Sequence, residues 1–309
     1  MIRIQRVLAP NPGVYTLEGT NTWVIGGGPS IVIDPGPLAE AHLDEVARVA
    51  GSVSHVLVTH DHEDHAEGAA AFAARMGAPL HAWRLPGAER IKDGARFSAG
   101  DGCTVVAVHT PGHSPDHVCV FAPEEGALFT GDTVLGRGTS FIDPPEGDLV
   151  KYLHSLQVLS DLHPRTIYPG HGPAVLDAEA KLREYVAHRA EREEQVVAGL
   201  AEGPATVDAL VATIYAEYPA EVHPLAARSV TAHLLKLEAE GRAERKGRGA
   251  SQTWVAGAPK ACARCGRPVK GRGTYCSSCL LTMLQEGADR AEGMGAHSEP
   301  TTRKGDRTT

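Results

Sequence analysis

The feature that most constrains the fold of this chain is the segment THDHEDH at residues 59–65, which carries three histidines and three acidic residues. The apolar segment before it, residues 53–58, predicts a buried strand, and residues 66–76 predict a helix. The histidines are therefore expected on the loop between strand and helix, where several side chains can point toward one spot. Because neutral imidazoles and carboxylates suit zinc and neighbouring transition metals, the segment predicts a metal site.

Three later segments add further potential ligands, each after an apolar run that predicts a strand. They are TPGH at residues 110–113, TGDT at 130–133 and YPGHG at 168–172, and they contribute His113, Asp132 and His171. A single histidine in such a position is usually an ordinary surface or core residue. Seven potential ligands in this order are instead typical of a metal or catalytic site.

The order and spacing of these motifs resemble the signature of the metallo-β-lactamase fold, in its glyoxalase II and nuclease branch, over roughly residues 1–190. The resemblance implies an α/β fold, an αββα sandwich with a metal site at one edge of two facing sheets. It also implies two ligand sets that share one bridging carboxylate. One metal is held by His60, His62 and His113, the second by Asp64, His65 and His171, and Asp132 bridges the two.

By the same resemblance the expected cofactors are two catalytic Zn²⁺ ions, although Mn²⁺ or Fe also suits this mixed ligand set. Two such cations lie roughly 3.5–4 Å apart and lower the pKa of the water between them. The resulting metal-bridging hydroxide attacks a carbonyl carbon or a phosphorus. Asp64 and Asp132 are the expected catalytic residues, with Asp64 also a candidate proton acceptor.

Three other residues are candidates to support the ligands through hydrogen bonds. A carboxylate that accepts the free N–H of a ligating imidazole fixes the tautomer of the ring, and Asp34 and Asp61 are candidates for that role. His117, four residues after His113, is the third candidate. For two of them an alternative stays open, with Asp61 as a solvated loop acid and His117 as an ordinary strand histidine.

The expected ligands disfavour two activities found on this fold. Zinc β-lactamases that the chain resembles usually have Cys or Ser in place of Asp132, and one group has Arg in place of His65. Oxygen-reducing diiron relatives have Glu in place of His62. Hydrolysis of antibiotics and redox chemistry are therefore not expected.

The chain is predicted to contain several units. Strands interleaved with helices predict a layered α/β domain, and two later helices followed by a hairpin at 241–254 predict a winged helix. The tail has too few large apolar residues to order itself. The predicted domains are a catalytic domain at 1–176, a connecting helix at 177–202, a winged helix at 203–257, a four-cysteine zinc-ribbon-like knuckle at 258–284 and a disordered tail at 285–309.

The six cysteines fall into two classes. Cys262, Cys265, Cys276 and Cys279 form two CxxC pairs separated by ten residues, a spacing that favours one structural Zn²⁺ in a cytosolic protein. Cys103 and Cys119 lie in apolar runs and are expected as buried free thiols. The start of the chain lacks the pattern of a signal peptide, and no apolar run has the length of a membrane span. A soluble, cytoplasmic protein is expected, with no membrane contact and with an oligomeric state that the sequence leaves open.

Several segments are similar to β-lactamase-like protein 2 and its bacterial relatives. They are TPGHSPDH at 110–117, GDTVLG at 131–136, IYPGHGP at 167–173, HRAERE at 188–193 and AHLLKLE at 232–238. The resemblance implies a metal-dependent endoribonuclease that acts on single-stranded RNA. Residues 241–273, with nine Lys or Arg and one acid, could contact the phosphates. The four-cysteine module is not part of the usual pattern of that family.

Two alternatives remain. The same metal cluster serves a thioesterase or other small-molecule ester hydrolase like glyoxalase II, although a winged helix stands where that enzyme has its glutathione-binding region. The chain also has few aromatic residues for stacking on bases, with five Phe, seven Tyr and three Trp. The third hypothesis is a DNA-binding regulator, for which Arg228, His233 and Lys236 are the candidate contacts on the second helix.

Overall fold

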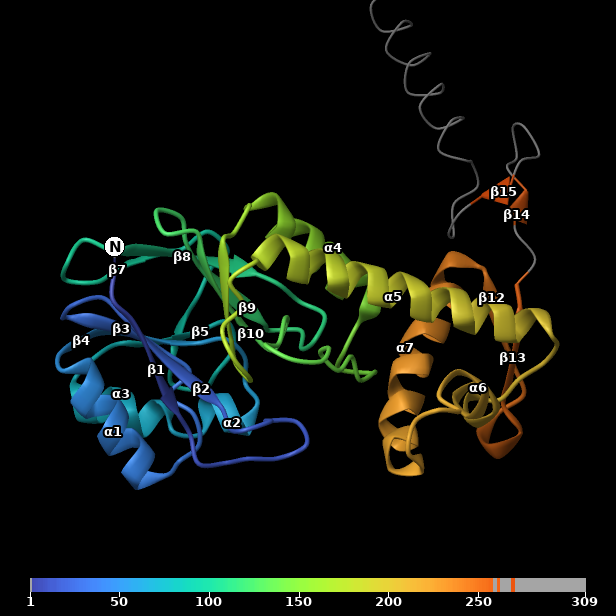
Figure 1. The fold of residues 1–309 in the computed structure, drawn as a ribbon, viewed down its shortest axis with the longest axis horizontal. Helices are drawn as coiled ribbons and strands as arrows, with labels where there is room; N and C mark the ends of the chain where they lie inside the picture. Colours follow the sequence, from blue (N-terminus) through green and yellow to red (C-terminus); the bar gives the residue numbers. More distant parts are fainter. Residues whose placement is uncertain (1, 258–259, 262–267, 270–309) are drawn as a thin grey trace, which may run out of the picture.

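The computed structural model describes residues 2–257, 260–261 and 268–269. Two β-sheets face each other in its larger part, as Figure 1 shows. The first sheet has its strands in chain order, with β1 to β3 antiparallel and β3 to β6 parallel. Its strands are β1 (Ile4–Leu8), β2 (Asn21–Ile25), β3 (Ser30–Ile33), β4 (Val53–Val58), β5 (Leu80–Ala82) and β6 (Glu89–Arg90).

The second sheet is mostly antiparallel, and only its edge strand β11 runs parallel to its neighbour β10. Its order is β11 (Thr166–Pro169), β10 (Ala127–Gly131), β9 (Val118–Ala122), β8 (Thr104–His109) and β7 (Arg96–Ser98). Side chains alternate between the two faces of a strand. In β9, Val118 and Val120 accordingly enter the core between the sheets, whereas Cys119 and Phe121 face the helices outside.

Helices cover both outer faces of the pair of sheets. Helices α1 (Glu40–Ala50) and α3 (Ala69–Met76) pack on the first sheet, where Leu43, Val46 and Phe72 are buried with the outward side chains of β3 and β4. Helices α4 (Leu149–Asp161) and α5 (Ala178–Ala201) cover the second sheet. The four layers are the αββα sandwich that the sequence predicted.

One local prediction was wrong. A short helix, α2 (Glu63–Ala66), precedes α3, so Asp64 and His65 lie on a helical turn and only His60 and His62 lie on the loop. The carboxylates of Glu63 and Asp64 stand in the first turn of α2, where the positive end of the helix dipole favours acidic side chains. Cys103 and Cys119 are buried free thiols, as expected.

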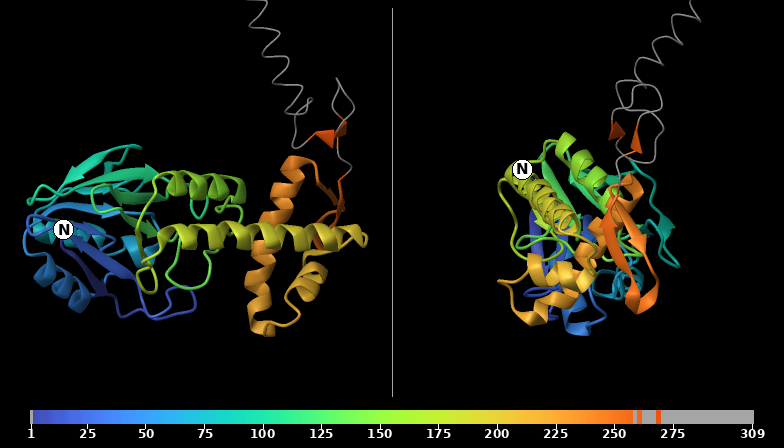
Figure 2. Two further views of the ribbon diagram at one scale, coloured as in Figure 1. Left: turned by 45° about the horizontal axis from the view of Figure 1, so that its top comes forward. Right: turned by 90° about the vertical axis from the view of Figure 1, so that its right-hand side faces the viewer.

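Helix α5 connects the sandwich to a second, smaller unit (Figure 2). Leu182 and Tyr185 near its start belong to the core beneath the second sheet, while Val196 and Leu200 near its end belong to the core of the smaller unit. That unit contains α6 (Val207–Ile214), the 3₁₀ turn η1 (Ala220–Val222), α7 (His223–Glu240), β12 (Ala243–Lys246), the 3₁₀ turn η2 (Gly249–Ser251) and β13 (Thr253–Ala256). Two helices followed by a hairpin form the predicted winged helix.

Beyond it, the structure describes only the two short paired strands β14 (Lys260–Ala261) and β15 (Pro268–Val269). The four cysteines of the predicted zinc knuckle and the predicted disordered tail lie outside the described residues. None of the described helices combines the length and the hydropathy needed to cross a membrane.

Candidate metal centre

The structure brings all seven predicted donors together at one edge of the sandwich. The loop after β4 supplies His60 and His62, and α2 supplies Asp64 and His65. The other three follow strands of the second sheet or lie between them. His113 is on the loop from β8 to β9, Asp132 directly follows β10, and His171 follows β11. The donors therefore come from strand ends of both sheets.

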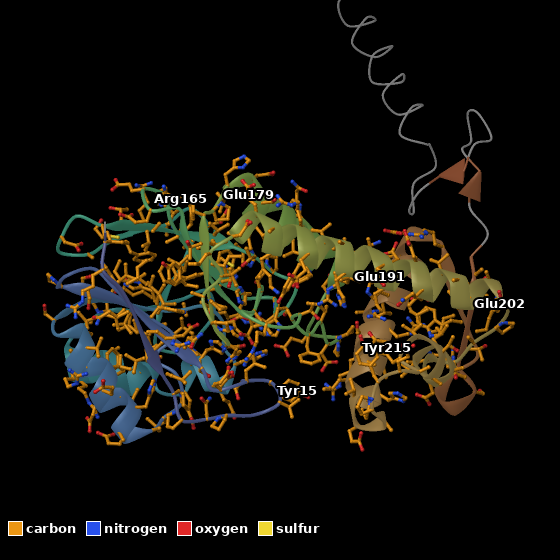
Figure 3. All side chains as sticks on the ribbon, in the orientation of Figure 1. Tyr15, Arg165, Glu179, Glu191, Glu202 and Tyr215 are labelled. Atoms are coloured by element: carbon orange, nitrogen blue, oxygen red, sulfur yellow. The ribbon has the colours of Figure 1, made fainter. Side chains whose placement is uncertain are left out.

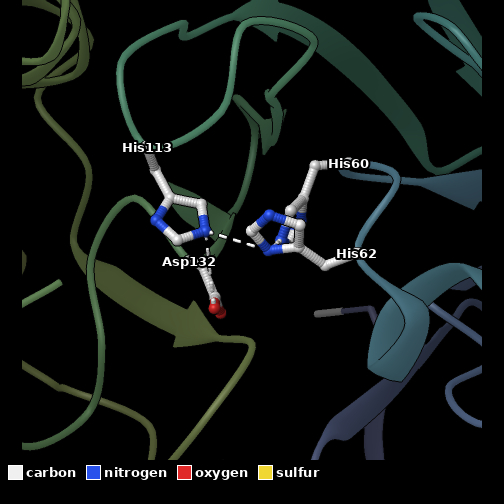
Figure 4. Close-up of side chains that lie close together, drawn as sticks. All are labelled: His60, His62, His113 and Asp132. Atoms are coloured by element: carbon white, nitrogen blue, oxygen red, sulfur yellow. Dashed lines mark hydrogen bonds and ion pairs between the residues drawn. The ribbon is translucent and has the colours of Figure 1, made fainter. Parts of the chain in front are cut away.

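One group consists of three imidazoles and a carboxylate, His60, His62, His113 and Asp132, and Figure 4 shows them close together. Nε2 of His60 lies 2.9 Å from Nδ1 of His62, and Nε2 of His113 lies 3.3 Å from the same Nδ1 atom. Oδ2 of Asp132 lies 3.8 Å from Nε2 of His113. Ring nitrogens that converge this closely suit a shared cation.

The second group consists of Asp64, His65 and His171. The Nε2 atoms of the two histidines are 3.2 Å apart, and Oδ2 of Asp64 lies 3.4 Å from His65 and 3.2 Å from His171. The two groups contain the same residues as the two ligand sets that the resemblance implied.

Asp132 faces both groups with different oxygen atoms. Its Oδ1 lies 3.4 Å from Nε2 of His65 and 3.3 Å from Nε2 of His171, while Oδ2 faces His113. Within the described residues Oδ1 is buried and has no hydrogen-bond partner. A buried carboxylate oxygen needs positive charge beside it, which among the described residues, without a bound metal, only protonated His65 and His171 supply. The position of Oδ1 among ring nitrogens therefore fits a site in which two bound cations would balance the charge of Asp132.

Where the pKa of a donor histidine is shifted, it is lowered in the first group and raised in the second. Burial and the neighbouring histidines hold the pKa of His60 well below its usual value, and burial also lowers that of His113, so both rings are neutral. Burial lowers the pKa of His171, but Asp132 and Asp64 outweigh that effect and raise it to about 9. Metal binding at the second group must therefore displace a proton.

Asp34, at the end of β3, holds several parts of the site in place. Its buried carboxylate accepts hydrogen bonds from the Thr59 backbone N–H at 2.7 Å, from the Thr59 hydroxyl at 2.8 Å and from Nδ1 of His65 at 2.8 Å. The Thr59 hydroxyl also lies 3.0 Å from Nδ1 of His60. Asp34 thus orients His65 directly and His60 through Thr59, as expected for a carboxylate behind the ligands.

The other two supporting candidates differ from each other. Asp61 is exposed and makes no hydrogen bond to any of the donor histidines in the described part of the chain, so it fits the alternative of a solvated loop acid. His117 is fully buried, and its Nε2 accepts the backbone N–H of Asp132 at 3.1 Å. His117 therefore positions the loop that carries Asp132.

Several supporting contacts were missed by sequence reasoning. Nδ1 of His113 donates to the Phe141 carbonyl at 2.9 Å, and Nδ1 of His171 lies 3.2 Å from the Gly19 carbonyl. The Thr20 hydroxyl donates to Oδ2 of Asp64 at 3.2 Å, and the Ser140 hydroxyl donates to the Asp132 carbonyl at 2.6 Å. Thr59 directly precedes His60 in the sequence. Gly19, Thr20, Ser140 and Phe141 lie outside the motifs, so no local pattern marked them.

Two glycines in the motifs leave room for the donors. A Cβ on Gly170 would come within 2.7 Å of both Oδ1 of Asp132 and Cε1 of His65. Gly131 has a φ of 44°, and a Cβ there would come within 2.7 Å of Nε2 of His117 and Oγ1 of Thr59. The glycine before His171 and the one before Asp132 are thus part of the site's geometry.

A cavity of about 300 Å³ opens onto the donors. Its walls include His62, Asp64, Asp132 and His171, and it is also lined by Arg228 from α7 of the winged helix. Tyr15, on the loop after β1, lines the cavity as well and lies at the side of the sandwich that faces the winged helix (Figure 3). Both structural units therefore enclose the space in which a substrate would meet the metals.

Two family models match the chain. Residues 15–171 match the metallo-beta-lactamase superfamily, and residues 206–254 match the beta-lactamase associated winged helix domain. The first match contains all seven donors, and the second contains α6, α7 and most of the hairpin. They agree with the two units of the described fold.

Curated relatives span most of the chain. A protein called beta-lactamase-like protein 2 homolog from Drosophila melanogaster is 36% identical over 262 residues, covering 77% of this chain and 88% of the relative. A protein called atrochrysone carboxyl ACP thioesterase from Aspergillus chevalieri is 34% identical, covering 82% of this chain and 86% of its own length. The expected resemblance to β-lactamase-like protein 2 is confirmed.

A solved structure shares the fold over both units. A metallo-beta-lactamase family protein from Thermus thermophilus superposes with a TM-score of 0.68 and 22% identity, covering 82% of this chain and 98% of that protein. At this identity the similarity establishes the fold of sandwich and winged helix together.

Proposed function

The chain belongs to the metallo-beta-lactamase superfamily, and on that premise we propose that it is a binuclear metal-dependent hydrolase that cleaves phosphodiester bonds in single-stranded RNA. His60, His62 and His113 would hold one Zn²⁺, and the second would be held by Asp64, His65 and His171. Asp132 would bind both through its two oxygens. Mn²⁺ or Fe suits the same donors.

When bound, the two cations supply a water of lowered pKa and neutralise the charge that develops on the substrate oxygen. The residues of the chain already bring the donors together. Burial raises the pKa of Asp64, but His65 and the hydrogen bond with His171 outweigh it and lower the pKa to about 2. Asp64 is therefore ionised at neutral pH, which suits a ligand and makes it a weak proton acceptor.

We propose a long substrate because the cavity over the donors lies between the two structural units. The space over the donors is bounded on one side by sandwich loops and on the other by Arg228 of α7. It adjoins a further cavity of about 420 Å³ along the same boundary. A chain that extends past the metals can fill both spaces, whereas a small ester needs only the first.

The positions of the basic residues do not support the reading of duplex DNA by α7. Arg228 forms an ion pair with Asp143 of the sandwich, and His233 is buried. Lys236 donates to Glu193 at 2.6 Å and to Glu240 at 2.7 Å. Each of the three candidate contacts is thus either paired with an acidic residue or buried.

Three basic residues in the described part of the basic block are also paired internally. Arg245 bonds to Glu238 at 2.6 Å, Lys246 pairs with Glu244, and Arg242 pairs with Glu193 and Glu240. Surface pairs of this kind can exchange partners, since each contributes little stability. RNA contacts by this block are nevertheless not needed for the proposal, because the substrate would lie in the cavities.

The second candidate function is hydrolysis of a thioester. It is favoured by the relative from Aspergillus chevalieri that is called a thioesterase, and the same metal centre would serve it. Attack on a thioester carbonyl and attack on a phosphodiester need the same nucleophile and the same cationic clamp.

The test is a side-by-side assay of the zinc-loaded protein on single-stranded RNA, S-lactoylglutathione and a chromogenic lactam. We expect RNA cleavage that disappears in His62→Ala and persists in His154→Ala, since His154 is exposed on α4. Robust thioester turnover without RNA cleavage would reverse the order of the two candidates.

The predicted knuckle requires a separate measurement. We propose three zinc ions per chain, two at the centre and one at Cys262, Cys265, Cys276 and Cys279. The double change Cys276→Ser and Cys279→Ser should remove one zinc and leave turnover of small substrates largely intact. A complete loss of that turnover would show that the knuckle is not a separate module.

A further inference from the structure

The cavity beside the metal centre has a one-sided charge. It shares Tyr15, Leu135, Ser140 and Phe141 with the metal-facing cavity. Among the described residues that line it there is no Asp or Glu, while three are arginines, namely Arg137, Arg189 and Arg192. The metal-facing cavity, in contrast, is lined by four acidic residues, Asp64, Asp132, Asp143 and Glu146.

Two of the arginines are buried without an acidic partner. Arg189 is 3% exposed and Arg192 is 7% exposed, and neither forms an ion pair with any carboxylate in the described ranges. The Nε atoms of both are buried and make no hydrogen bond there. Arg137, by comparison, pairs with Glu18. Arg189 and Arg192 thus present unneutralised guanidinium groups to the cavity.

Within the described residues, the hydrogen bonds and ring contacts of the two guanidinium groups are all with neutral groups. Arg189 donates to the Ser140 carbonyl and lies 5.3 Å from the ring centre of Tyr152. Arg192 donates to Gln195 at 2.7 Å and lies 4.6 Å from the ring centre of Tyr215. These contacts orient the groups and help to attach α5. They do not neutralise two neighbouring positive charges, which are costly to bury without an anion.

The cavity connects to the metal centre through Ser140. The Ser140 carbonyl accepts a hydrogen bond from Arg189. The Ser140 hydroxyl donates to the Asp132 carbonyl at 2.6 Å and lies 3.3 Å from Nδ1 of His113. Tyr215 and Tyr218 line the same cavity, with ring centres 5.5 Å apart. An anion at the arginines would therefore lie close to the reacting group, beside aromatic rings.

We propose that this cavity is a phosphate subsite, in which Arg189 and Arg192 bind a phosphate group of the substrate adjacent to the bond that is cleaved at the metals. The planar guanidinium fork matches the oxygen geometry of a phosphate. Tyr218, which is 50% exposed, offers a ring face on which a base can stack. The identity of the strand as RNA rests on the proposed function; the binding of the phosphate does not.

The first experiment measures binding without turnover. Adenosine 5′-monophosphate is titrated calorimetrically into the zinc-loaded protein, where we expect two sites per chain, one at the metals and one at the arginines. Arg192→Gln should lose one site or weaken it about tenfold or more, in line with the strength of charged hydrogen bonds. Arg183→Gln, an exposed change on the same helix that removes a residue paired with Glu179, should keep both sites.

Two variants of Ser229 on α7 test the subsite even if Arg192→Gln does not fold. Ser229 lines the cavity and is half-buried. Ser229→Glu introduces a carboxylate that can pair with the arginines and should abolish the second site. Ser229→Gln has almost the same size without the charge and should retain it. Equal binding in wild type, Arg192→Gln and Ser229→Glu would overturn the proposal.

The second experiment separates the subsite from the proposed activity. Arg192→Gln should raise the KM for an RNA oligonucleotide about tenfold and leave the turnover of bis(p-nitrophenyl) phosphate, which has no second phosphate for the subsite, unchanged. If wild-type protein binds the second nucleotide but cleaves no RNA, the subsite stands and the proposed substrate fails. If RNA is cleaved and the KM of Arg192→Gln is unchanged, the subsite fails and the proposed activity stands.

Discussion

The backbone N–H of Asp132 donates a hydrogen bond to Nε2 of His117, with a distance of 3.1 Å between the nitrogens. His117 can accept it because burial and the nearby His113 hold its pKa well below the usual value, which keeps the ring neutral. Nδ1 of His117 lies 3.0 Å from the Thr110 hydroxyl and 3.1 Å from the Thr133 hydroxyl. His117, which belongs to neither donor group, thus holds the backbone of Asp132, the residue whose carboxylate faces both groups.

Replacement of His117 by alanine should weaken metal binding without the removal of a donor. Loss of such a supporting contact typically costs about 10- to 100-fold in metal affinity. Competition with a chromogenic chelator measures the affinity, and His154→Ala on the exposed face of α4 is the matched control. Unchanged affinity in His117→Ala would mean that the Asp132 loop holds its position by itself.

Asp34 and Asp61 provide a second matched pair. Asp34→Asn weakens the hydrogen bonds with Thr59 and Nδ1 of His65 and should lower metal affinity by about 10- to 100-fold. Asp61→Asn removes an exposed carboxylate and should have no such effect. The same chelator competition checks both, and an equal loss in the two variants would contradict the assigned role of Asp34.

Gly170→Ala should disrupt the centre although no donor is changed. The added Cβ would come within 2.7 Å of Asp132 and His65, one from each side of the site, so at least one of them must move. Metal analysis after gel filtration should show the loss of the centre's metals, with thermal unfolding to show that the chain still folds. Gly27→Ala, at an exposed position with room for a methyl group, is the control. Full metal content in Gly170→Ala would show that a Cβ at this position does not displace Asp132 or His65.

His233 should make the fold sensitive to acid. It is 1% exposed, neither ring nitrogen has a hydrogen-bond partner in the described ranges, and burial together with nearby Arg189 and Lys236 lowers its pKa to about 3. The unfolded chain has the usual histidine pKa of roughly 6.5. Below that pH only the unfolded state takes up the proton, so stability is complete above roughly pH 6.5 and is lost as the pH falls toward 3.

Urea unfolding between pH 7 and pH 4 measures this effect. Below about pH 6, the free energy of unfolding of wild type should fall by about 1.4 kcal/mol per pH unit more steeply than that of His233→Leu. His154→Leu should follow the wild-type slope, because His154 is exposed. Parallel slopes for wild type and His233→Leu would show that His233 is protonated in the folded protein.

The donors of the metal centre could be predicted because they stand in short motifs directly after apolar strands. Parallel and facing strands bring their ends to a common edge, so His60, His113, Asp132 and His171 meet there once the strands pair. The helical position of Asp64 and His65 was missed, since four residues carry too little periodicity to predict a helix. Asp34 was a correct candidate for support, while Gly19, Thr20 and Phe141 contribute through contacts that no local pattern marks.

The sequence by itself determined the chemistry of the site and the two-unit architecture, because ligand types, motif spacing and the alternation of side chains are local properties of the chain. Only the tertiary structure decided which charges remain free. It pairs Lys236, Arg242 and Arg245 with acidic residues of α5 and α7, and it buries Arg189 and Arg192 beside the metal centre without an acidic partner in the described residues. The reason is that the effect of a charge depends on the neighbours and the solvent around it, and both are set by packing between distant segments.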